Sequence, residues 1–173
     1  YDWCWIIDPL DGTKEFIKKN GQFTANIGLT FKGVPVFGIV SVPVKGKIYY
    51  GAKDLGSFKL DKNNNLQKLK IKKNHIPIKI CVSNSHMNDE TKEYLKKYEK
   101  YDCVNVGSSI KLLWIAENKS DLYPRLAPTS EWDICASHAV VKYAGGHVLQ
   151  YEKDDELEYN KENLLNPYFI VSK

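Results

Sequence analysis

One stretch near the beginning of the chain constrains the fold more than any other: Trp5-Ile-Ile-Asp-Pro-Leu-Asp-Gly-Thr13. The apolar run from Trp3 to Ile7 predicts a buried strand, and it ends in two carboxylates three residues apart, Asp8 and Asp11. Pro9 fixes its own φ at about −65° and disfavours a helical residue before it, so the chain must turn directly after the strand. The strand therefore delivers two negative charges to one fixed point.

The oxygen atoms at this turn suit a metal ion. Two carboxylates held close together raise each other's pKa unless a cation lies between them. With the Leu10 carbonyl as a third oxygen, the set favours Mg²⁺, which usually shares its ligand shell with a substrate phosphate. Gly12 permits close backbone approach, and Thr13 can begin a short helix through Ile17 with free N–H groups facing an anion. The stretch predicts a metal site beside a phosphate site, although Asp-Pro and Asp-Gly also occur in ordinary turns.

A second element lies far downstream, where Asp133 falls in the first turn of a helix predicted from Trp132 to Tyr143. An acidic residue is common at this position in ordinary helices, because the helix dipole favours negative charge there. Gly145 and Gly146 are expected to end the helix. Small side chains form a face for close packing on a sheet: Ala136, Ala139, Val140 and Ala144.

Three segments of the chain form a joint pattern: Asp8-Pro-Leu-Asp-Gly-Thr13, Trp132-Asp133 and Ala144-Gly-Gly146. In this order and spacing they resemble the two signatures of the lithium-sensitive, magnesium-dependent inositol monophosphatase superfamily. Further segments resemble the 3'(2'),5'-bisphosphate nucleotidase branch of that superfamily: Lys14-Glu-Phe16, Asn20 to Ile27, Gly107-Ser-Ser109 and Leu122-Tyr-Pro-Arg125. The resemblance covers nearly the whole chain. It implies an α+β fold, a layered α/β/α/β sandwich with an antiparallel meander followed by a mixed α/β half.

The resemblance also implies roles for individual residues. Two or three Mg²⁺ ions are expected, with Asp8 bridging two of them. The implied metal ligands are Asp8, Leu10 through its carbonyl, Asp11 and Asp133. The implied catalytic residues are Asp8 and Thr13, whose hydroxyl shares the attacking water with a glutamate from an upstream Gly-Glu-Glu-type loop. The implied substrate-binding residues are Leu10, Asp11, Gly12, Thr13, Ser108, Arg125 and Asp133.

Three further polar residues are candidates for substrate contacts. Ser108 follows a predicted strand and precedes an apolar helix, where it could hold a ribose or phosphate oxygen, or only cap the helix. Arg125 is the only arginine among the 25 lysines and arginines. A lone arginine suits bidentate phosphate binding, although a surface ion pair would give the same pattern. His86 is a candidate phosphate contact at a strand end, and an ordinary surface histidine would look the same.

The pattern of strands and turns divides the chain into two parts. Residues 1–74 contain the metal-motif strand and an antiparallel meander, with alternation between Phe23 and Leu29 and turns at Lys32-Gly33 and Lys45-Gly46. Residues 75–173 alternate strands with helices and form the α/β part. The acidic segment from Tyr151 to Asn163 is expected to be a surface loop.

Length and composition limit the class of protein. With 173 residues, of which 43% are hydrophobic, the chain is long enough for one domain with a substantial core. The net charge of +4 comes from scattered lysines, which favours a small polyanionic substrate, here a phosphorylated nucleotide, over a nucleic acid polymer. No apolar run approaches the roughly 20 residues of a membrane span, so no membrane insertion is expected.

The cysteines indicate a reducing compartment. No Cys-x-x-Cys pair occurs, and the four cysteines have apolar neighbours: Cys4, Cys81, Cys103 and Cys135. We expect four buried, reduced thiols in a cytoplasmic protein. The resemblance implies a monomer or a homodimer.

The predicted function is a Mg²⁺-dependent phosphatase that hydrolyses the 3'-phosphate of adenosine 3',5'-bisphosphate to give AMP and phosphate. One alternative is an inositol monophosphatase or another sugar-phosphate phosphatase. The chain begins at Tyr1, and the family it resembles carries helices and a glutamate-bearing loop upstream of the first signature. We therefore expect a C-terminal part of a longer protein, weakly active or inactive alone. A second alternative is a truncated remnant that binds metal and nucleotide without turnover.

Overall fold

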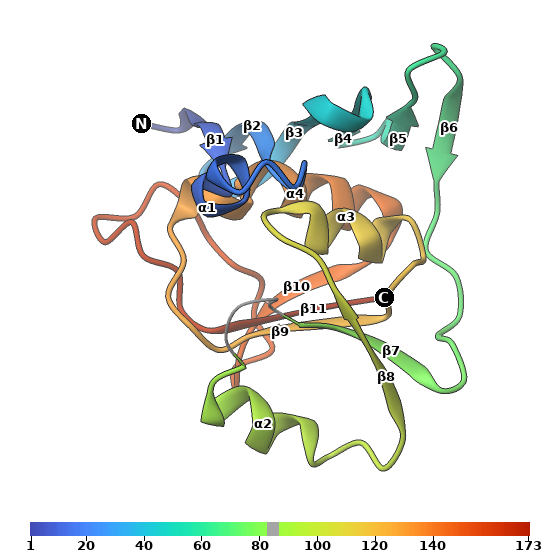
Figure 1. Cartoon of the computed structure of the whole chain (residues 1–173). Coiled ribbons are helices and arrows are strands. Elements are labelled where there is room, and N and C mark those ends of the chain that lie inside the picture. Colours follow the sequence, from blue (N-terminus) through green and yellow to red (C-terminus); the bar gives the residue numbers. More distant parts are fainter. Residues whose placement is uncertain (83–86) are drawn as a thin grey trace.

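Two sheets, the helices between them and a helix on the outer side of the second sheet form four layers in the computed structural model, which describes residues 1–82 and 87–173 (Figure 1). Helices α3 (Ile110–Ala116) and α4 (Glu131–Ala144) lie between the two sheets, and α2 (Asp89–Leu95) covers the far side of the second sheet. From α2 onwards the layers are α/β/α/β, so the predicted α+β sandwich is confirmed. His86 lies outside the described residues.

The first sheet is the predicted antiparallel meander. Its six strands are neighbours in sequence order, from β1 to β6. Their bounds are β1 Trp3–Asp11, β2 Thr24–Phe31, β3 Val34–Val42, β4 Lys47–Ala52, β5 Gly56–Leu60 and β6 Leu66–Leu69. A short helix, α1 (Thr13–Ile17), follows β1, and a 3₁₀ turn, η1 (Pro43–Lys45), follows β3.

The second sheet is mixed. Its five strands are ordered β10-β11-β9-β7-β8, with β7 parallel to β8 and β9, and with β11 antiparallel to β9 and β10. Their bounds are β7 Ile78–Val82, β8 Tyr101–Asn105, β9 Leu122–Arg125, β10 His147–Gln150 and β11 Phe169–Ser172. The segment from Tyr151 to Asn163 contains no helix or strand, but the prediction that it is a surface loop is partly wrong, because Leu157 and Tyr159 are buried in the core. The division at residue 74 stays a prediction; side chains from both parts share one core.

The prediction that β1 is fully buried is wrong. Trp3, Trp5 and Ile7 are 58%, 59% and 56% exposed, whereas Asp8 is buried and Ile6 packs against the core. Successive side chains of a strand point to opposite faces, so a continuous apolar run does not by itself show that both faces are covered. Only the face that carries Asp8 is turned toward the helices.

Helix α4 lies directly on the first sheet because three glycines make room for it. Gly28, Gly38 and Gly51 are direct neighbours across β2, β3 and β4. A Cβ atom built on Gly38 would lie 2.1 Å from the carbonyl oxygen of Ala136, so no larger residue fits there. The predicted small-residue face of the helix is thereby explained, and this close packing brings Asp133, in the first turn, next to β1.

The cysteine prediction is partly wrong. Cys81 and Cys135 are buried, Cys4 is half-buried, and Cys103 is exposed. Cys103 lies on β8, which is the edge strand of the second sheet, so no neighbouring strand covers its outer side. All four thiols are free, as expected.

None of the helices in the described ranges combines the length and the apolar character that a membrane crossing requires.

Candidate active site

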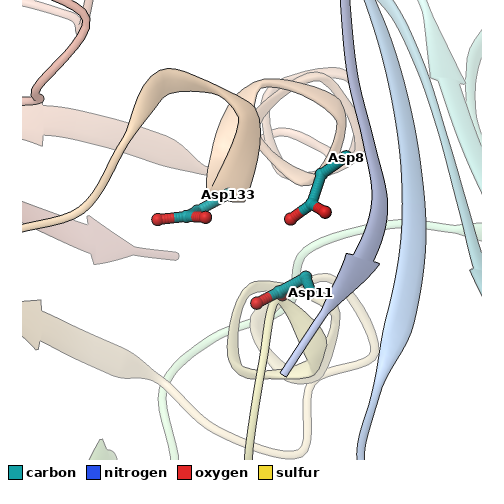
Figure 2. Close-up of side chains that lie close together, drawn as sticks. All are labelled: Asp8, Asp11 and Asp133. Atoms are coloured by element: carbon teal, nitrogen blue, oxygen red, sulfur yellow. The ribbon is translucent and has the colours of Figure 1, made fainter. Parts of the chain in front are cut away.

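Three carboxylates from two distant parts of the chain meet at one point. Asp8 and Asp11 come from the end of β1, and Asp133 comes from the first turn of α4. Each offers an oxygen atom, and these atoms lie within 4.8 Å of one another. Figure 2 shows the three side chains pointing into the same small space. The structure thus brings together the three aspartates that the sequence predicted as metal ligands.

The turn that joins the two aspartates of β1 is an irregularity in the sheet. Asp8 faces Asn26 on β2, Asp11 faces Thr24, and the register shifts between these two pairs. The Leu10 N–H donates to Asp8 Oδ1 at 3.0 Å, which closes the turn. A bulge of this kind re-aims side chains. It lets two carboxylates that are three residues apart point into the same space.

The Asp133 side chain can cap helix α4 and offer an oxygen to a metal ion at the same time. Its Oδ2 accepts a hydrogen bond from the Ser130 N–H at 2.8 Å, as part of a capping box at the start of α4. A carboxylate has two oxygens, so this contact leaves Oδ1 for another partner. The ordinary helix-cap explanation of Asp133 and the metal-ligand explanation are therefore compatible.

Burial makes this cluster costly without a cation. Burial raises the pKa of Asp8, and it raises the pKa of Asp11 to about 6. The negative charges of the neighbouring carboxylates add to both shifts, while the Ser109 N–H and the Lys111 ammonium oppose the shift of Asp11. Hard oxygen donors that repel each other at this separation are what a divalent cation such as Mg²⁺ neutralises. The residues present therefore fit a metal ion.

A cleft of about 350 Å³ opens beside the aspartates. Five of the predicted residues line it: Asp11, Gly12, Ser108, Arg125 and Asp133. The cleft is bordered by α1 and by the loop before α3. Gly12 has φ +88°, a left-handed conformation that favours glycine, and Thr13, which begins α1, is exposed. The roles predicted for Thr13 and for the Leu10 carbonyl stay predictions.

Two polar atoms at this cleft are buried and have no hydrogen-bond partner within the described part of the chain: Ser108 Oγ and Arg125 Nε. Arg125 is anchored at its other end, because Nη2 donates to the Pro128 carbonyl at 2.8 Å. Ser108 has φ +52°, which is unusual for a residue with a side chain. Unpaired buried polar atoms are costly, so both positions favour a polar ligand in the cleft.

The sequence analysis missed Lys111 as a cleft residue. Its ammonium donates to the Ser108 carbonyl at 2.8 Å, and the side chain lines the cleft although it is mostly buried. Lys14 also lines the cleft, so three cations surround the space beside the aspartates. A lysine inside the apolar helix Ile110–Ala116 was the available signal, because such a residue needs a partner for its charge.

Comparison with known proteins places the chain in a family. The profile of the inositol monophosphatase family matches residues 1–172. The chain belongs to the inositol monophosphatase family. Such an assignment fits the acidic cluster, which could bind a metal ion.

Individual relatives narrow the similarity to one branch. The 3'(2'),5'-bisphosphate nucleotidase CysQ of Salmonella typhimurium is 41% identical over 97% of this chain and 67% of its own length. The protein of the same name from Escherichia coli K12 is 40% identical over the same shares. The crystal structure of CysQ from Bacteroides thetaiotaomicron has a TM-score of 0.93 and 41% identity, and the match covers 99% of this chain and 70% of that one. The chain thus spans about two thirds of these relatives.

Proposed function

We propose that the chain is the metal- and phosphate-binding part of a Mg²⁺-dependent phosphatase that converts adenosine 3',5'-bisphosphate to AMP and phosphate. The observation that carries this proposal is the convergence of Asp8, Asp11 and Asp133 beside a cleft lined by cations. Relatives named 3'(2'),5'-bisphosphate nucleotidase, about 40% identical over nearly the whole chain, support the choice of substrate.

The aspartates hold the catalytic cations in this proposal. Asp8 and Asp11 contribute one or both carboxylate oxygens, Asp133 contributes the oxygen not used by Ser130, and the Leu10 carbonyl adds a fourth donor. Two or three Mg²⁺ ions, when bound, polarise the phosphoryl oxygens and lower the pKa of a water. The chain's own contribution is a set of oxygens whose mutual repulsion is relieved by a bound cation or by protonation.

The residues that follow Asp11 bind and orient the phosphate. Gly12, with its left-handed backbone, allows the phosphate to approach the amides of Gly12 and Thr13 closely. Lys14 follows directly and lines the same cleft. The Thr13 hydroxyl orients the attacking water for displacement in line with the leaving oxygen. These assignments rest on position, on the conformation of Gly12 and on the lining of the cleft.

The cations of the cleft favour a substrate with two phosphates. Arg125, Lys111 and Lys14 line the cleft together with the carboxylates of Asp11, Glu15 and Asp133. Once bound metal ions offset the carboxylates, the three cations could pair with more than one phosphate group. Arg125 Nε and Ser108 Oγ are the unpaired polar atoms there, and a ribose hydroxyl or a second phosphate would pair with them. An inositol hydroxyl could also pair with Ser108 Oγ, so it is the second phosphate, placed at Arg125, that favours the nucleotide over inositol phosphate.

Phosphate release tests the proposal directly. The chain, and a form extended upstream, would be assayed with Mg²⁺ on adenosine 3',5'-bisphosphate and on inositol 1-phosphate side by side. We expect the extended form to hydrolyse the nucleotide preferentially. A preference for inositol 1-phosphate would replace the proposed substrate, and failure of both forms on both esters would leave a metal- and nucleotide-binding remnant.

A matched pair of variants separates the site from general effects of charge. Asp11→Asn removes a proposed metal ligand, whereas Asp89→Asn makes the same change on α2, where the side chain is 94% exposed. We expect only the first to abolish Mg²⁺-dependent phosphate release. Equal loss, or no loss, in the two variants would contradict the assignment of Asp11.

A cytoplasmic location and a monomeric or homodimeric state complete the proposal. The four free thiols support a reducing compartment. Sedimentation equilibrium of the purified protein measures its oligomeric state, and a single species with the mass of one chain would exclude the dimer.

A further inference from the structure

A buried polar network lies directly behind the aspartates. Thr24, Asn26 and Ser109 are 0%, 1% and 2% exposed. Thr24 and Asn26 are the residues of β2 that face Asp11 and Asp8, and Ser109 precedes the first residue of α3. Three polar side chains without access to water, placed next to a carboxylate cluster, need a reason because burying them is costly.

The network converges on one oxygen of Asp11. Asp11 Oδ2 accepts from the Ser109 N–H at 2.5 Å and from the Thr24 hydroxyl at 3.2 Å. The hydroxyls of Thr24 and Ser109 lie 2.8 Å apart. Asn26 completes the network, because its Oδ1 accepts from Ser109 Oγ at 3.0 Å and its Nδ2 donates to Thr24 Oγ1 at 3.4 Å. Every contact here joins residues of β1, β2 and the start of α3.

These contacts decide which oxygen of Asp11 is left for a ligand. Because Oδ2 already accepts two hydrogen bonds, it is tied to the protein, and rotation of the carboxylate would break both. Oδ1 is then the oxygen left for a ligand shared with Asp8 and Asp133. Hydrogen-bonded partners of this kind orient metal ligands in other proteins and tune their affinity.

The Thr24 hydroxyl contributes more to the orientation of Asp11 than the Ser109 hydroxyl does. The two hydroxyls have one hydrogen each, and three oxygen–oxygen contacts compete for them. A hydrogen bond to a carboxylate is stronger than one between neutral groups, so the Thr24 hydrogen is directed to Asp11. Ser109 holds Asp11 through its backbone N–H, and its one hydroxyl hydrogen goes either to Asn26 Oδ1 or to Thr24 Oγ1.

We propose that Thr24 and Ser109 are positioning residues for Asp11, which fix its carboxylate so that one oxygen is presented to the metal. The inference rests on the proposed function, since it assumes that Asp11 is a metal ligand. It has a second consequence. The same Ser109 N–H holds the loop that carries Ser108, so the metal site and the substrate cleft share one anchor.

The chain offers a matched control for a purely structural role. Thr30 lies on the same strand as Thr24 and on the same face, is 0% exposed, and donates to the Cys4 carbonyl at 3.3 Å. Thr30→Val and Thr24→Val therefore both remove a buried hydroxyl from β2. Only Thr24 contacts a carboxylate of the cluster. A difference in metal affinity between the two variants would come from that contact.

The experiment measures binding of Mn²⁺, used as a probe for Mg²⁺, by calorimetry or by electron paramagnetic resonance, together with the melting temperature. We expect Thr24→Val to weaken Mn²⁺ binding by about 10-fold or more, the usual cost of losing a group that orients a ligand. Thr24→Ser, which keeps the hydroxyl, should restore most of the affinity. Thr30→Val should lower the melting temperature similarly and leave the affinity unchanged.

Each outcome separates this inference from the proposed function. If Thr24→Val binds Mn²⁺ as tightly as Thr30→Val, while Asp8→Asn abolishes binding, the inference is overturned and the metal site stands. If the unsubstituted protein does not bind Mn²⁺, the proposed function fails and the inference fails with it. Should Thr24→Val not fold, Thr24→Ala, which also removes the hydroxyl, replaces it, with Thr30→Ala as its control: equal affinity in these two variants would overturn the inference, and weaker binding in Thr24→Ala alone would support it.

Discussion

Buried carboxylates are treated in opposite ways in two regions of this molecule. Asp121, just before β9, accepts hydrogen bonds from the His75 N–H at 3.1 Å and the Lys79 N–H at 2.7 Å, and forms an ion pair with Lys173. Burial alone would raise its pKa, but these partners together hold the pKa below its usual value. Asp121 is therefore neutralised from within the chain.

The aspartate cluster lacks such compensation. The pKa of Asp8 and of Asp11 is raised, with burial as the main cause. Lys111 is the lysine that opposes this shift at Asp11, and its ammonium donates to the Ser108 carbonyl. At Asp121 the protein supplies its own cation, Lys173, and two backbone N–H donors, and the result is stability. At the cluster the groups of the chain leave the pKa of both carboxyls raised, which costs stability and favours the binding of a cation from solution.

The largest expected effect is the loss of activity in Asp8→Asn. Removing a ligand that serves the metal site should lower Mg²⁺-dependent turnover of the complete protein by about 100-fold or more, since metal ions contribute several kcal/mol to such reactions. The fold should remain intact. Because the substitution also removes an uncompensated charge, the melting temperature without metal should stay the same or rise. Phosphate release and thermal unfolding measure both quantities.

Lower stability in Asp8→Asn without metal would contradict the comparison, because it would mean that the carboxylate is compensated from within the chain. Unchanged turnover would contradict the assignment of Asp8 as a metal ligand.

Asp121→Ala should give the opposite pattern. The substitution removes the shared acceptor of His75, Lys79 and Lys173, and a buried charge left without its partner typically costs about 3–5 kcal/mol. We expect a loss of this size in the free energy of unfolding, measured by urea denaturation. Binding of Mn²⁺ to the folded fraction should not change. A loss below about 1 kcal/mol would indicate that the ion pair behaves like a surface pair.

The pH dependence of stability should also distinguish the two regions. In the metal-free protein the pKa of Asp11, about 6, lies above its ordinary value of 3.8, so its contribution to stability is fully present below about pH 4. That contribution is lost as the pH rises through 6. The lowered pKa of Asp121 has the opposite sign: its contribution is present above its unfolded pKa and is lost as the pH falls.

Urea denaturation of the metal-free protein between pH 4 and pH 7 tests this. Compared with the unsubstituted protein, Asp11→Asn should be more stable by on the order of 1–2 kcal/mol at pH 7, and this gain should shrink toward pH 4. Saturating Mg²⁺ should stabilise the unsubstituted protein at pH 7 and thereby reverse the difference. An Asp11→Asn gain that does not vary with pH would contradict a raised pKa.

The sequence predicted the meander from local patterns, whereas the layers and the metal-ligand set of three aspartates were implied by the resemblance to a family. Alternating residues define strands, and the small face of α4 reports the close packing on Gly28, Gly38 and Gly51. The meeting of Asp8, Asp11 and Asp133 was predicted from the order of the family signatures, because no local pattern connects residues about 120 positions apart.

The parts that the sequence did not predict depend on contacts between distant elements. Thr24 and Ser109 are 85 positions apart, and no periodicity indicates that their hydroxyls meet. Lys111 was not predicted as a cleft residue, because its position in the cleft depends on how α3 packs in the fold. The exposure of Trp3 and Trp5 was missed for a related reason: apolar composition does not show which face of a strand is covered.

The smallest expected effect concerns Glu117, a second internally compensated carboxylate. Its side chain is 4% exposed and pairs with Lys59 at 2.9 Å and with Lys119 at 2.5 Å, and these lysines keep its pKa below the usual value despite burial. The Lys119 side chain is 47% exposed, whereas that of Lys59 is 17% exposed. Lys119→Ala should therefore cost less than about 1 kcal/mol, because water can replace an exposed partner.

Lys59→Ala should cost more than Lys119→Ala, since Lys59 is the less exposed of the two and its loss leaves Glu117 with a partner that extends into solvent. Urea denaturation of both variants in low and high salt measures the difference, and only the Lys119 contribution should shrink strongly with salt. If the two costs were equal and large, Glu117 would need both cations. The charge of Glu117 would then depend on its cations as strongly as the charges of the aspartate cluster do. The two regions would differ only in the source of the cation, which is the chain itself at Glu117 and the solution at the cluster.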